Sequence, residues 1–321
     1  MRKKSKSLAA VLCLAMFAAM AMGSGSSSSS EPSKVGEVKA ESEAVSEEAA
    51  APVEEKTEYH VGDILSANDM EIVYAASGEY VEDNEFMQPA DGNKLVFIKL
   101  AFENTGSSDT TVSSLLFEGY ADGYNVEQHF TGSDLSATLS PGRTTEGVIV
   151  FEVPQDAQQI EIEYETNVFT SDKIKFIYDG DVDSGYVQEG NATASETAFV
   201  VGDIVESSNL NIAYLSCEND TSYNEYFGPS EGCHFVTLTF EFENKGDKDE
   251  IITMWDFDCY AAGKHCEQSY FRDDALDATL SPGRKAQGTV TFEVPDGASV
   301  VEAEFVSNIW TSSRVVFTVT E

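Results

Sequence analysis

Basic residues are scarce in this chain of 321 residues. It has 19 lysines and arginines against 57 aspartates and glutamates, which gives a formal net charge of −38 at pH 7. Binding to nucleic acid or to anionic lipid head groups depends on Lys and Arg side chains that neutralise phosphates. The composition therefore argues against a nucleic-acid partner and against direct membrane binding by the folded part of the chain. It favours cationic partners, a divalent metal ion, or simple solubility.

Common catalytic motifs are absent as well. The chain has no Gly-x-Ser-x-Gly, no His-Glu-x-x-His and no glycine-rich loop that would cradle phosphates. No window of a dozen residues in its later part has helical spacing of apolar residues. These absences predict a protein that is not an enzyme and that contains little helix.

The N-terminus reads as a secretory signal over residues 1–23. Four basic residues precede an apolar run over residues 8–22, and small residues such as Ala21 follow at the cleavage position. The run is shorter than the about 20 residues of a membrane-spanning helix, and an uncleaved anchor is the alternative. Bacterial lipoproteins carry a lipid-bearing cysteine before such a Gly/Ser run, but Met22 stands there, which argues against a lipid anchor. We expect a secreted or cell-surface protein.

Removal of this signal makes the chain still more acidic. The signal contains four of the 19 basic residues and none of the 57 acidic ones, so 15 basic residues remain and the mature net charge is −42. Residues 24–58 are rich in Ser, Glu and Ala and poor in aromatic residues. Such a composition buries too little apolar surface to offset its ordering entropy, so we expect a disordered acidic tether.

The rest of the chain repeats itself, with a first repeat over 59–178, an acidic linker over 179–198 and a second repeat over 199–321. One block of seven residues, Ala-Thr-Leu-Ser-Pro-Gly-Arg, is identical in both copies, with colinear matches on either side. None of the four histidines has a counterpart in the other repeat. The matched segments are 61–64 and 201–204, 102–104 and 242–244, 137–143 and 278–284, and 151–154 and 292–295.

Within a repeat the apolar residues alternate with a period of two. In residues 95–102 one face carries Val, Ile, Leu and Phe, which is typical of a strand with one face in a core. Asp122-Gly123 and Ala262-Gly263 have the positions of two-residue type I′ hairpin turns. The pattern predicts an all-β chain with two tandem immunoglobulin-like β-sandwich domains. Strands are expected near 61–66, 70–76, 95–102, 112–120, 124–130, 145–153, 159–165 and 173–178.

The order of the scaffold motifs resembles a bacterial extracellular domain family of unknown function. That family has a fold similar to the secreted immunoprotective antigen of mycobacteria. The resemblance implies an immunoglobulin-like fold, a surface location and no established enzymatic role, and it brings no catalytic residues. The motifs are Pro-x-x-Gly at 89–92 and 229–232, Asn-x-Gly at 104–106 and 244–246, and then Leu-x-Pro-Gly and Phe-x-Val-Pro in each repeat.

Four cysteines lie in the second repeat and none in the first. An even number in an exported domain predicts disulfides. The hairpin at Ala262-Gly263 sets Cys259 opposite Cys266, which leaves Cys217 to pair with Cys233. A zinc site that uses the neighbouring His234 and His265 is the alternative, although no Cys-x-x-Cys spacing supports it.

Two segments are candidate binding sites. The first is the long loop before the central strand, with Asn84, Glu85 and Phe86 in the first repeat and Asn224, Glu225 and Tyr226 in the second. We predict a recognition surface there; in the alternative, the two aromatic rings plug the open end of each sandwich.

The second segment is Asp179, Asp181 and Asp183, whose alternate carboxylates could bind Ca²⁺. A solvated acidic linker is the favoured explanation of them, and no other cofactor is expected.

We therefore predict a non-enzymatic extracellular interaction module that binds an unidentified protein or glycan partner. The alternative is a structural envelope protein whose repeats act as spacers without a specific ligand.

Overall fold

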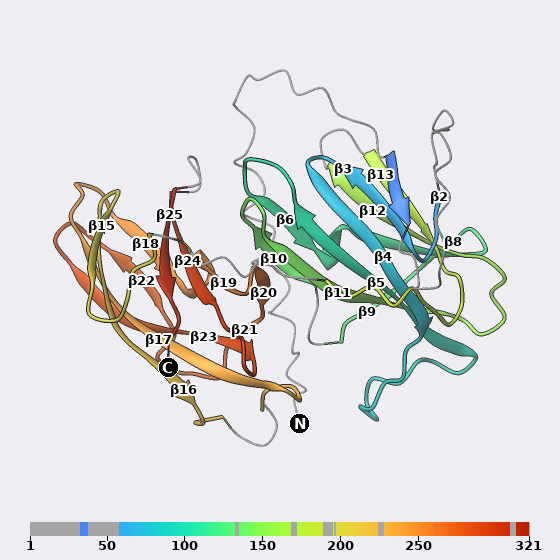
Figure 1. Cartoon of the computed structure of the whole chain (residues 1–321). Helices are drawn as coiled ribbons and strands as arrows, with labels where there is room; N and C mark the ends of the chain where they lie inside the picture. The colour runs from blue at the N-terminus through green and yellow to red at the C-terminus, as the bar shows by residue number, and fades with distance from the viewer. Residues whose placement is uncertain are drawn as a thin grey trace. The chain divides into compact units, whose positions relative to one another are not determined.

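The computed structural model describes residues 33–37, 58–131, 135–167, 172–188, 195, 197–223, 228–308 and 313–320. These residues form strands β1 to β25 and short 3-10 turns, so the predicted all-β class is confirmed. None of the helices among them has the length and apolar character to cross a membrane. Figure 1 colours repeat 1 from blue to yellow-green and repeat 2 from yellow to red.

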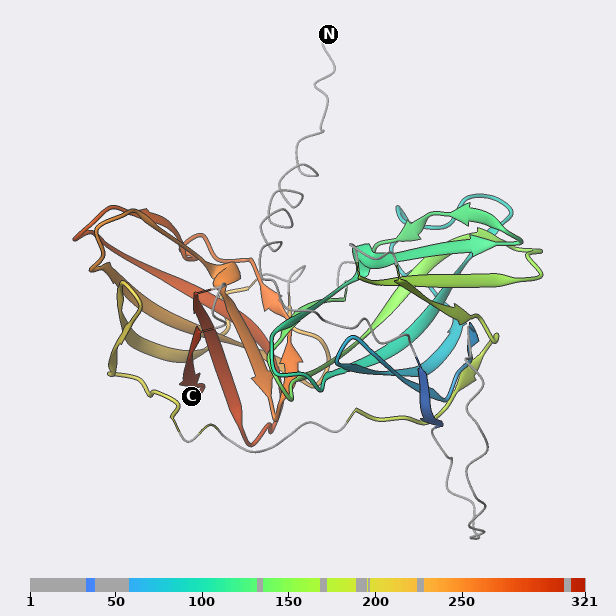
Figure 2. The same cartoon turned by 90° about the horizontal axis from the view of Figure 1, so that it is seen from above.

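Repeat 1 is a sandwich of two layers (Figure 2), in which neighbouring strands pair antiparallel except β2, which pairs parallel with β13. Aromatic rings from both layers meet in its core: Phe102 lies 5.7 Å from Tyr164, and Tyr74 lies 5.3 Å from Phe176. One layer has the order β3 (Asp63–Ala67), β4 (Met70–Glu79), β5 (Asn93–Asn104) and β11 (Thr144–Pro154), with β14 (Val182–Asp183) on β4 and β9 (Gln128–His129) on β11. The other has the order β2 (Glu58–Tyr59), β13 (Asp172–Ile177), β12 (Ile160–Asn167), β7 (Phe117–Ala121) and β8 (Tyr124–Val126), and β6 (Thr110–Ser113) pairs with β10 (Ser136–Leu139).

Repeat 2 is built in the same way and has its own core. Phe240 and Phe242 of the central strand pack against Phe257, Phe305 and Phe317. One layer has the order β15 (Ile204–Ser207), β16 (Leu210–Asp220), β17 (Cys233–Asn244), β23 (Lys285–Pro295) and β21 (Gln268–Ser269). The other has the order β20 (Lys264–Cys266), β19 (Phe257–Ala261), β24 (Val301–Asn308) and β25 (Ser313–Thr318), and β18 (Glu250–Thr253) pairs with β22 (Asp277–Leu280).

The predicted strand faces and hairpins are confirmed. Val96, Ile98, Leu100 and Phe102 all point into the core with at most 1% of their surface exposed. Asp122 and Gly123 both have positive φ, 49° and 81°, as a type I′ turn requires, and the Ala262-Gly263 turn has the same form. The predicted strand over 112–120 is broken in two by the 3-10 turn Ser114–Leu116.

The Asn-x-Gly motif has a clear structural reason. The side chain of the fully buried Asn104 donates to the carbonyl oxygens of Ser108 and Leu139 and accepts from the N–H of Gly106. Asn244 makes the same three bonds in repeat 2. One amide thus ties the end of the central strand to the neighbouring loop, because every buried polar group needs a partner.

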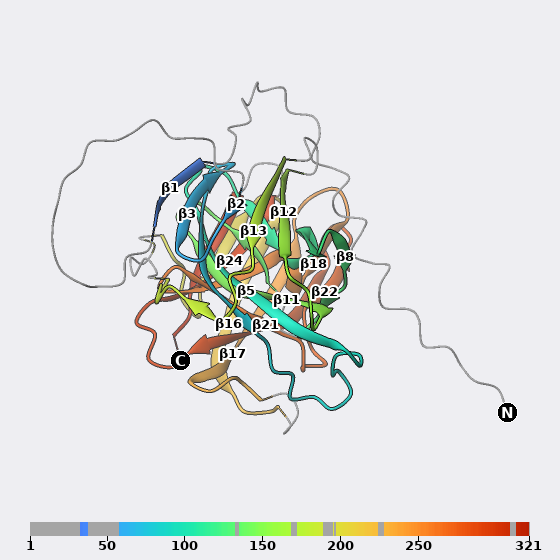
Figure 3. The same cartoon turned by 90° about the vertical axis from the view of Figure 1, so that its right-hand side faces the viewer.

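Part of the expected tether is ordered, so the prediction of disorder was wrong for it. Residues Ser33–Glu37 form β1, which pairs antiparallel with β3 (Figure 3). The physical reason is that β3 would otherwise expose a row of unpaired backbone groups at the edge of its sheet.

Candidate functional site

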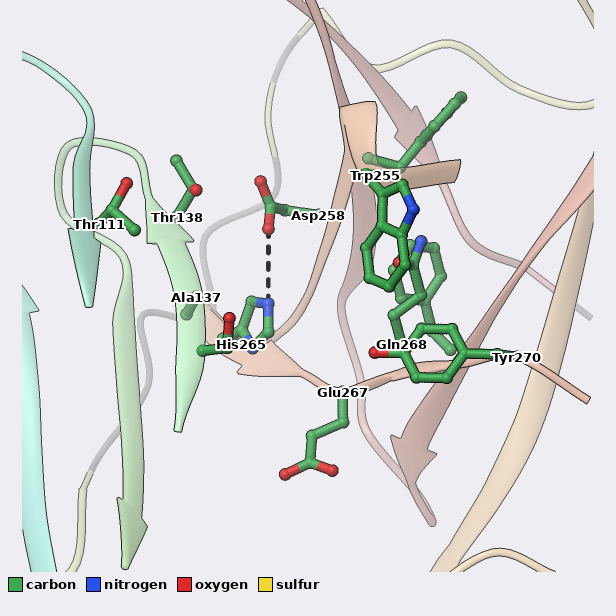
Figure 4. A pocket seen from close by; sticks show the side chains of 12 residues that line it. Thr111, Ala137, Thr138, Trp255, Asp258, His265, Glu267, Gln268 and Tyr270 are labelled. Atoms are coloured by element: carbon green, nitrogen blue, oxygen red, sulfur yellow. Dashed lines mark ion pairs between the residues drawn. The ribbon is translucent and has the colours of Figure 1, made fainter. Parts of the chain in front are cut away.

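A cleft of about 350 Å³ lies between strands of the two repeats. On one side are Thr111, Ala137 and Thr138 of β6 and β10, and on the other are side chains from β19 to β21 and the turn before them (Figure 4). The lining of repeat 2 consists of Trp255, Phe257, Asp258, His265, Glu267, Gln268, Tyr270 and Phe292.

Two large aromatic side chains form the outer wall of this cleft. Trp255 is 63% exposed and Tyr270 is 61% exposed, and their ring centroids are 5.1 Å apart at an interplanar angle of 41°. Figure 4 shows the two rings close together, with Gln268 beside them. Exposed aromatic pairs of this kind contact ligands, because a rigid ring buries a large area at little cost in entropy.

Local structure holds Trp255 in place. It is the middle residue of the 3-10 turn Met254–Asp256, whose start is capped by Asp256: one carboxylate oxygen accepts from the backbone N–H and the hydroxyl of Thr253. Burial raises the pKa of Asp256 even though these bonds act in the opposite direction. Gln268 donates to the carbonyl oxygen of Met254 at 2.7 Å, which ties the strand before Tyr270 to the turn.

The floor of the cleft is polar and carries acidic groups. His265 Nε2 lies 3.5 Å from Asp258 Oδ1 (Figure 4), and Glu267 also lines the cleft. Thr111 and Thr138 add hydroxyl groups on the side of repeat 1. An aromatic wall with a few hydrogen-bonding groups has the composition of a site that binds a small polar ligand or a short segment of a larger one.

Contacts between the repeats fix the two sides of the cleft. The Arg143 guanidinium binds the carboxylates of Glu302 and Glu304 at 2.7 to 3.0 Å and lies 4.6 Å from the centre of the Tyr260 ring. Burial opposes the charge of Arg143, but its bonds to the two carboxylates outweigh that effect and raise its pKa. The N–H of Thr144 also donates to the carbonyl oxygen of Gly263, so a backbone bond joins β11 to the β19–β20 hairpin.

The predicted recognition loop of repeat 1 is ordered and presents an apolar tip. Asn84 Oδ1 accepts from the N–H of Phe86, and Gln88 donates to the carbonyl oxygens of Glu82 and Asn84. Phe86 is 87% exposed, so its ring does not plug the sandwich. The hydrogen bond from His129 is the main reason for the lowered pKa of Glu82, and this contact anchors the base of the loop. Glu85 is exposed, and Asn224, Glu225 and Tyr226 lie outside the described residues.

Cys233, Cys259 and Cys266 of repeat 2 have free thiols in the structure. The predicted register of the hairpin is confirmed, since Cys259 lies directly opposite Cys266. Both are buried, and burial raises the pKa of the Cys259 thiol.

The predicted pairing of Cys217 with Cys233 was wrong. Cys217 lies opposite Leu238, five residues along β17 from Cys233. At about 3.3 Å per residue the two cysteines are about 16 Å apart, too far for a disulfide. The ladder between β16 and β17 continues to Asp220 and Phe235, beyond the point at which the sequence suggests a loop.

The three aspartates of the expected calcium segment have separate partners. Asp179 binds His60 Nδ1 and the N–H of Val61, Asp181 accepts from the N–H of Glu79, and Asp183 accepts from the N–H of Gly185. In the part of the chain that the structure describes, no group of three or more His, Cys, Asp or Glu could hold a metal ion. These hydrogen bonds attach the start of the expected linker to repeat 1, and β14 extends the sheet there.

Sequence reasoning missed the cleft because its two sides come from different repeats. One signal was present: the positions of Trp255 and Tyr270 in repeat 2 correspond to Leu115 and Phe130 in repeat 1, and all four side chains are exposed. An apolar residue kept at an exposed turn in both copies is a sign of contact with a ligand or partner.

Comparisons with known proteins agree with the two repeats. Residues 59–174 and 199–315 each match one family, described as "Domain of unknown function (DUF4352)". None of the curated proteins matches the chain in sequence.

Similar solved structures include three bacterial proteins. The yjhA protein from Bacillus subtilis has 16% sequence identity over 38% of this chain and 99% of its own, with a TM-score of 0.31. An uncharacterized β-sandwich protein from Clostridium difficile has 11% identity over 40% of this chain and 98% of its own, with a TM-score of 0.28. The secreted protein MPT63 from Mycobacterium tuberculosis has 11% identity over 39% of this chain and 99% of its own, with a TM-score of 0.31.

Proposed function

Since the chain belongs to the DUF4352 family of domains of unknown function in both of its repeats, we propose a function from its own site: a non-enzymatic extracellular module that binds a glycan or protein partner. The N-terminal signal pattern supports an extracellular location. The single observation that carries the proposal is the exposed pair of Trp255 and Tyr270 at the wall of a polar cleft. Aromatic anchors beside hydrogen-bonding groups are typical of recognition sites.

Charge narrows the kind of ligand. Asp258 and Glu267 line the cleft, and the mature chain has a net charge of −42, worked from its 57 acidic and 15 remaining basic residues. Anionic ligands are repelled by such a surface. The cleft therefore suits a neutral sugar, an amino sugar, or a polar or basic peptide segment that stacks on the two rings.

Binding to soluble polysaccharides tests this function. The mature chain is run by affinity electrophoresis in gels that contain neutral polysaccharides or a polymer of amino sugars, and in parallel it is titrated with basic peptides. We expect retention in at least one medium, and we expect it to be lost when both rings are removed by Trp255→Ala and Tyr270→Ala.

The matched control is Tyr124→Ala, which removes a ring that is 78% exposed and does not line the cleft. Retention that survives the double variant, or that falls equally with Tyr124→Ala, would contradict the proposal. Phe86→Ala tests the loop tip in the same assay, because a partner that spans both sites would lose affinity with either change.

A structural envelope spacer is the second candidate. It is favoured by the buried contacts of Arg143 with Glu302 and Glu304, which fasten the repeats to each other. A spacer predicts that no medium retains the chain, whereas a binding module predicts retention that depends on the aromatic pair.

A further inference from the structure

The contact that joins the two repeats uses elements that both repeats possess. We call residues 140–143 of repeat 1 and 281–284 of repeat 2 the docking turns, because both have the sequence Ser-Pro-Gly-Arg. Inside the chain, the docking turn of repeat 1 contacts β24 of repeat 2: Ser140 and Arg143 bind Glu304, and Arg143 also binds Glu302. The contact buries both carboxylates, whose side chains are 2% and 5% exposed.

The docking turn of repeat 2 has the same conformation but is exposed. The N–H of Arg284 donates to Ser281 at 2.9 Å and the N–H of Gly283 donates to Asn244 at 2.8 Å, and the corresponding bonds of repeat 1 measure 3.0 and 2.8 Å. The residues of this turn are exposed, and the next residue is the basic Lys285 in place of the buried Thr144. A preformed cationic turn therefore faces solvent at the end of repeat 2.

Repeat 1 retains the surface on which such a turn docks. Glu161 lies opposite Tyr120 in the sheet of repeat 1, as Glu302 lies opposite Tyr260 in repeat 2. Glu163 of repeat 1 corresponds in the same way to Glu304. We call Tyr120, Glu161 and Glu163 the acidic strand face; its two carboxylate side chains are 22% and 25% exposed.

The charges of the two elements are complementary. Around the acidic strand face there are four carboxylates, Glu58, Glu118, Glu161 and Glu163, and two ammonium groups, Lys173 and Lys175. The excess of two negative charges attracts the guanidinium of Arg284, whereas the ammonium group of Lys285 already pairs with Glu241 and Glu243. An arginine binds carboxylates through a fork of two N–H groups, and it therefore displaces a lysine from part of such a site.

We propose that the exposed docking turn of repeat 2 binds the acidic strand face of repeat 1 in a second copy of this chain. The step from one molecule to the next then repeats the step from repeat 1 to repeat 2, and a contact of this heterologous kind generates head-to-tail arrays. The contact inside the chain supplies the geometry. Arg284 would lie over the ring of Tyr120 as Arg143 lies over that of Tyr260, and the N–H of Lys285 would face the carbonyl oxygen of Gly123 as that of Thr144 faces Gly263.

The overall negative charge opposes this association, and the salt concentration sets the strength of that repulsion relative to the direct ion pairs. At about 0.15 M ionic strength the Debye length is about 8 Å, so repulsion between distant charges is largely screened while direct ion pairs are screened less. Because Lys173 and Lys175 already neutralise part of the acidic strand face, the association is weaker than the contact inside the chain.

Sedimentation velocity on the mature chain tests the proposal, at 0.15 M salt and over concentrations up to the millimolar range. For the wild type we expect a sedimentation coefficient that rises with concentration. Arg284→Glu is expected to raise the dissociation constant by about tenfold or more. Lys94→Glu is the matched control, since it makes the same change in charge on β5 of repeat 1, and it should leave association unchanged.

A charge exchange makes the test specific. Glu163→Arg alone should also abolish association, and combining it with Arg284→Glu in one chain should restore it, because every contact then pairs the exchanged charges. A wild type that is monomeric at every concentration, an Arg284→Glu variant that associates like the wild type, or equal losses in Arg284→Glu and Lys94→Glu would each overturn the proposal. Circular dichroism of each variant checks that both sandwiches remain folded.

Discussion

Removing the guanidinium that joins the repeats provides a sharp test of the structure. Arg143→Ala leaves Glu302 and Glu304 without their main partner. Ser195 still donates its N–H to Glu302, Ser140 still donates its hydroxyl to Glu304, and Arg314 Nε stays 3.4 Å from Glu304. Loss of one partner from a buried ion pair costs about 3 to 5 kcal/mol. The two remaining hydrogen bonds place the expected cost near the lower limit, at about 3 kcal/mol.

Separation of the two repeats limits the free energy that Arg143→Ala can cost. If the repeats separate, both carboxylates regain water, so the measured loss cannot exceed the free energy that holds the repeats together. Unfolding of either repeat has to break the contact in the wild type. The variant should therefore lower the midpoint of the first unfolding transition by about 1 to 2 M urea, at a slope of about 2 kcal/mol per molar.

Two spectroscopic signals separate the repeats in this experiment. Both tryptophans, Trp255 and Trp310, belong to repeat 2, so their fluorescence follows that repeat, whereas far-UV circular dichroism follows both. Arg284→Ala is the matched control, because it removes the same side chain from an identical but exposed turn. If the two variants differ by less than about 0.5 kcal/mol, a typical value for surface substitutions, the buried contact does not stabilise the protein.

Three further predictions concern repeat 2. Asn244→Ala should lower the free energy of unfolding by about 1 to 3 kcal/mol in urea titrations, because the carbonyl oxygens of Leu280 and Lys248 lose their donor; no change would mean that water replaces the amide. Burial would raise the pKa of Asp220, but bonds from Ser222, Thr237 and Arg272 outweigh it and lower the pKa to about 2. A lowered pKa stabilises the fold above the unfolded value near 3.8, and the effect is lost as pH falls from about 4 to about 2. The difference in stability between the wild type and Asp220→Asn should thus be about 1 to 2 kcal/mol at neutral pH, after allowance for solvent screening, and should shrink over that acid range; a constant difference would refute it. Cys217 and Cys233 are half-buried, whereas Cys259 and Cys266 are buried. Alkylation of the native protein, followed by peptide mapping, should therefore modify the first two cysteines before the other two. Equal rates of alkylation would contradict this difference in burial.

The fold was largely predictable because its signals are local. The alternation in residues 95–102 follows from the period of a strand with one buried face, and the hairpin at Asp122-Gly123 follows from the positive φ that a type I′ turn needs. The same local logic placed Cys259 opposite Cys266. It failed for Cys217 and Cys233, because how far a hairpin ladder extends depends on packing that a loop composition does not reveal.

The candidate site was not predictable in the same way. The predicted loop at Phe86 is exposed and ordered, yet the cleft beside Trp255 needs side chains of both repeats. Residues at least 117 positions apart in sequence, such as Thr138 and Trp255, are brought together there, and no periodicity or spacing encodes such a pairing.

The two copies of one β-sandwich follow from the amino-acid sequence alone, since the repeated strand pattern and turn residues act within each copy. The different environments of the two identical docking turns, in contrast, arise from the tertiary structure. Arg143 is held against two buried carboxylates and Arg284 lies in solvent. The reason is that burial and charge pairing depend on what a residue meets in space, and an identical sequence of seven residues carries no information about its neighbour.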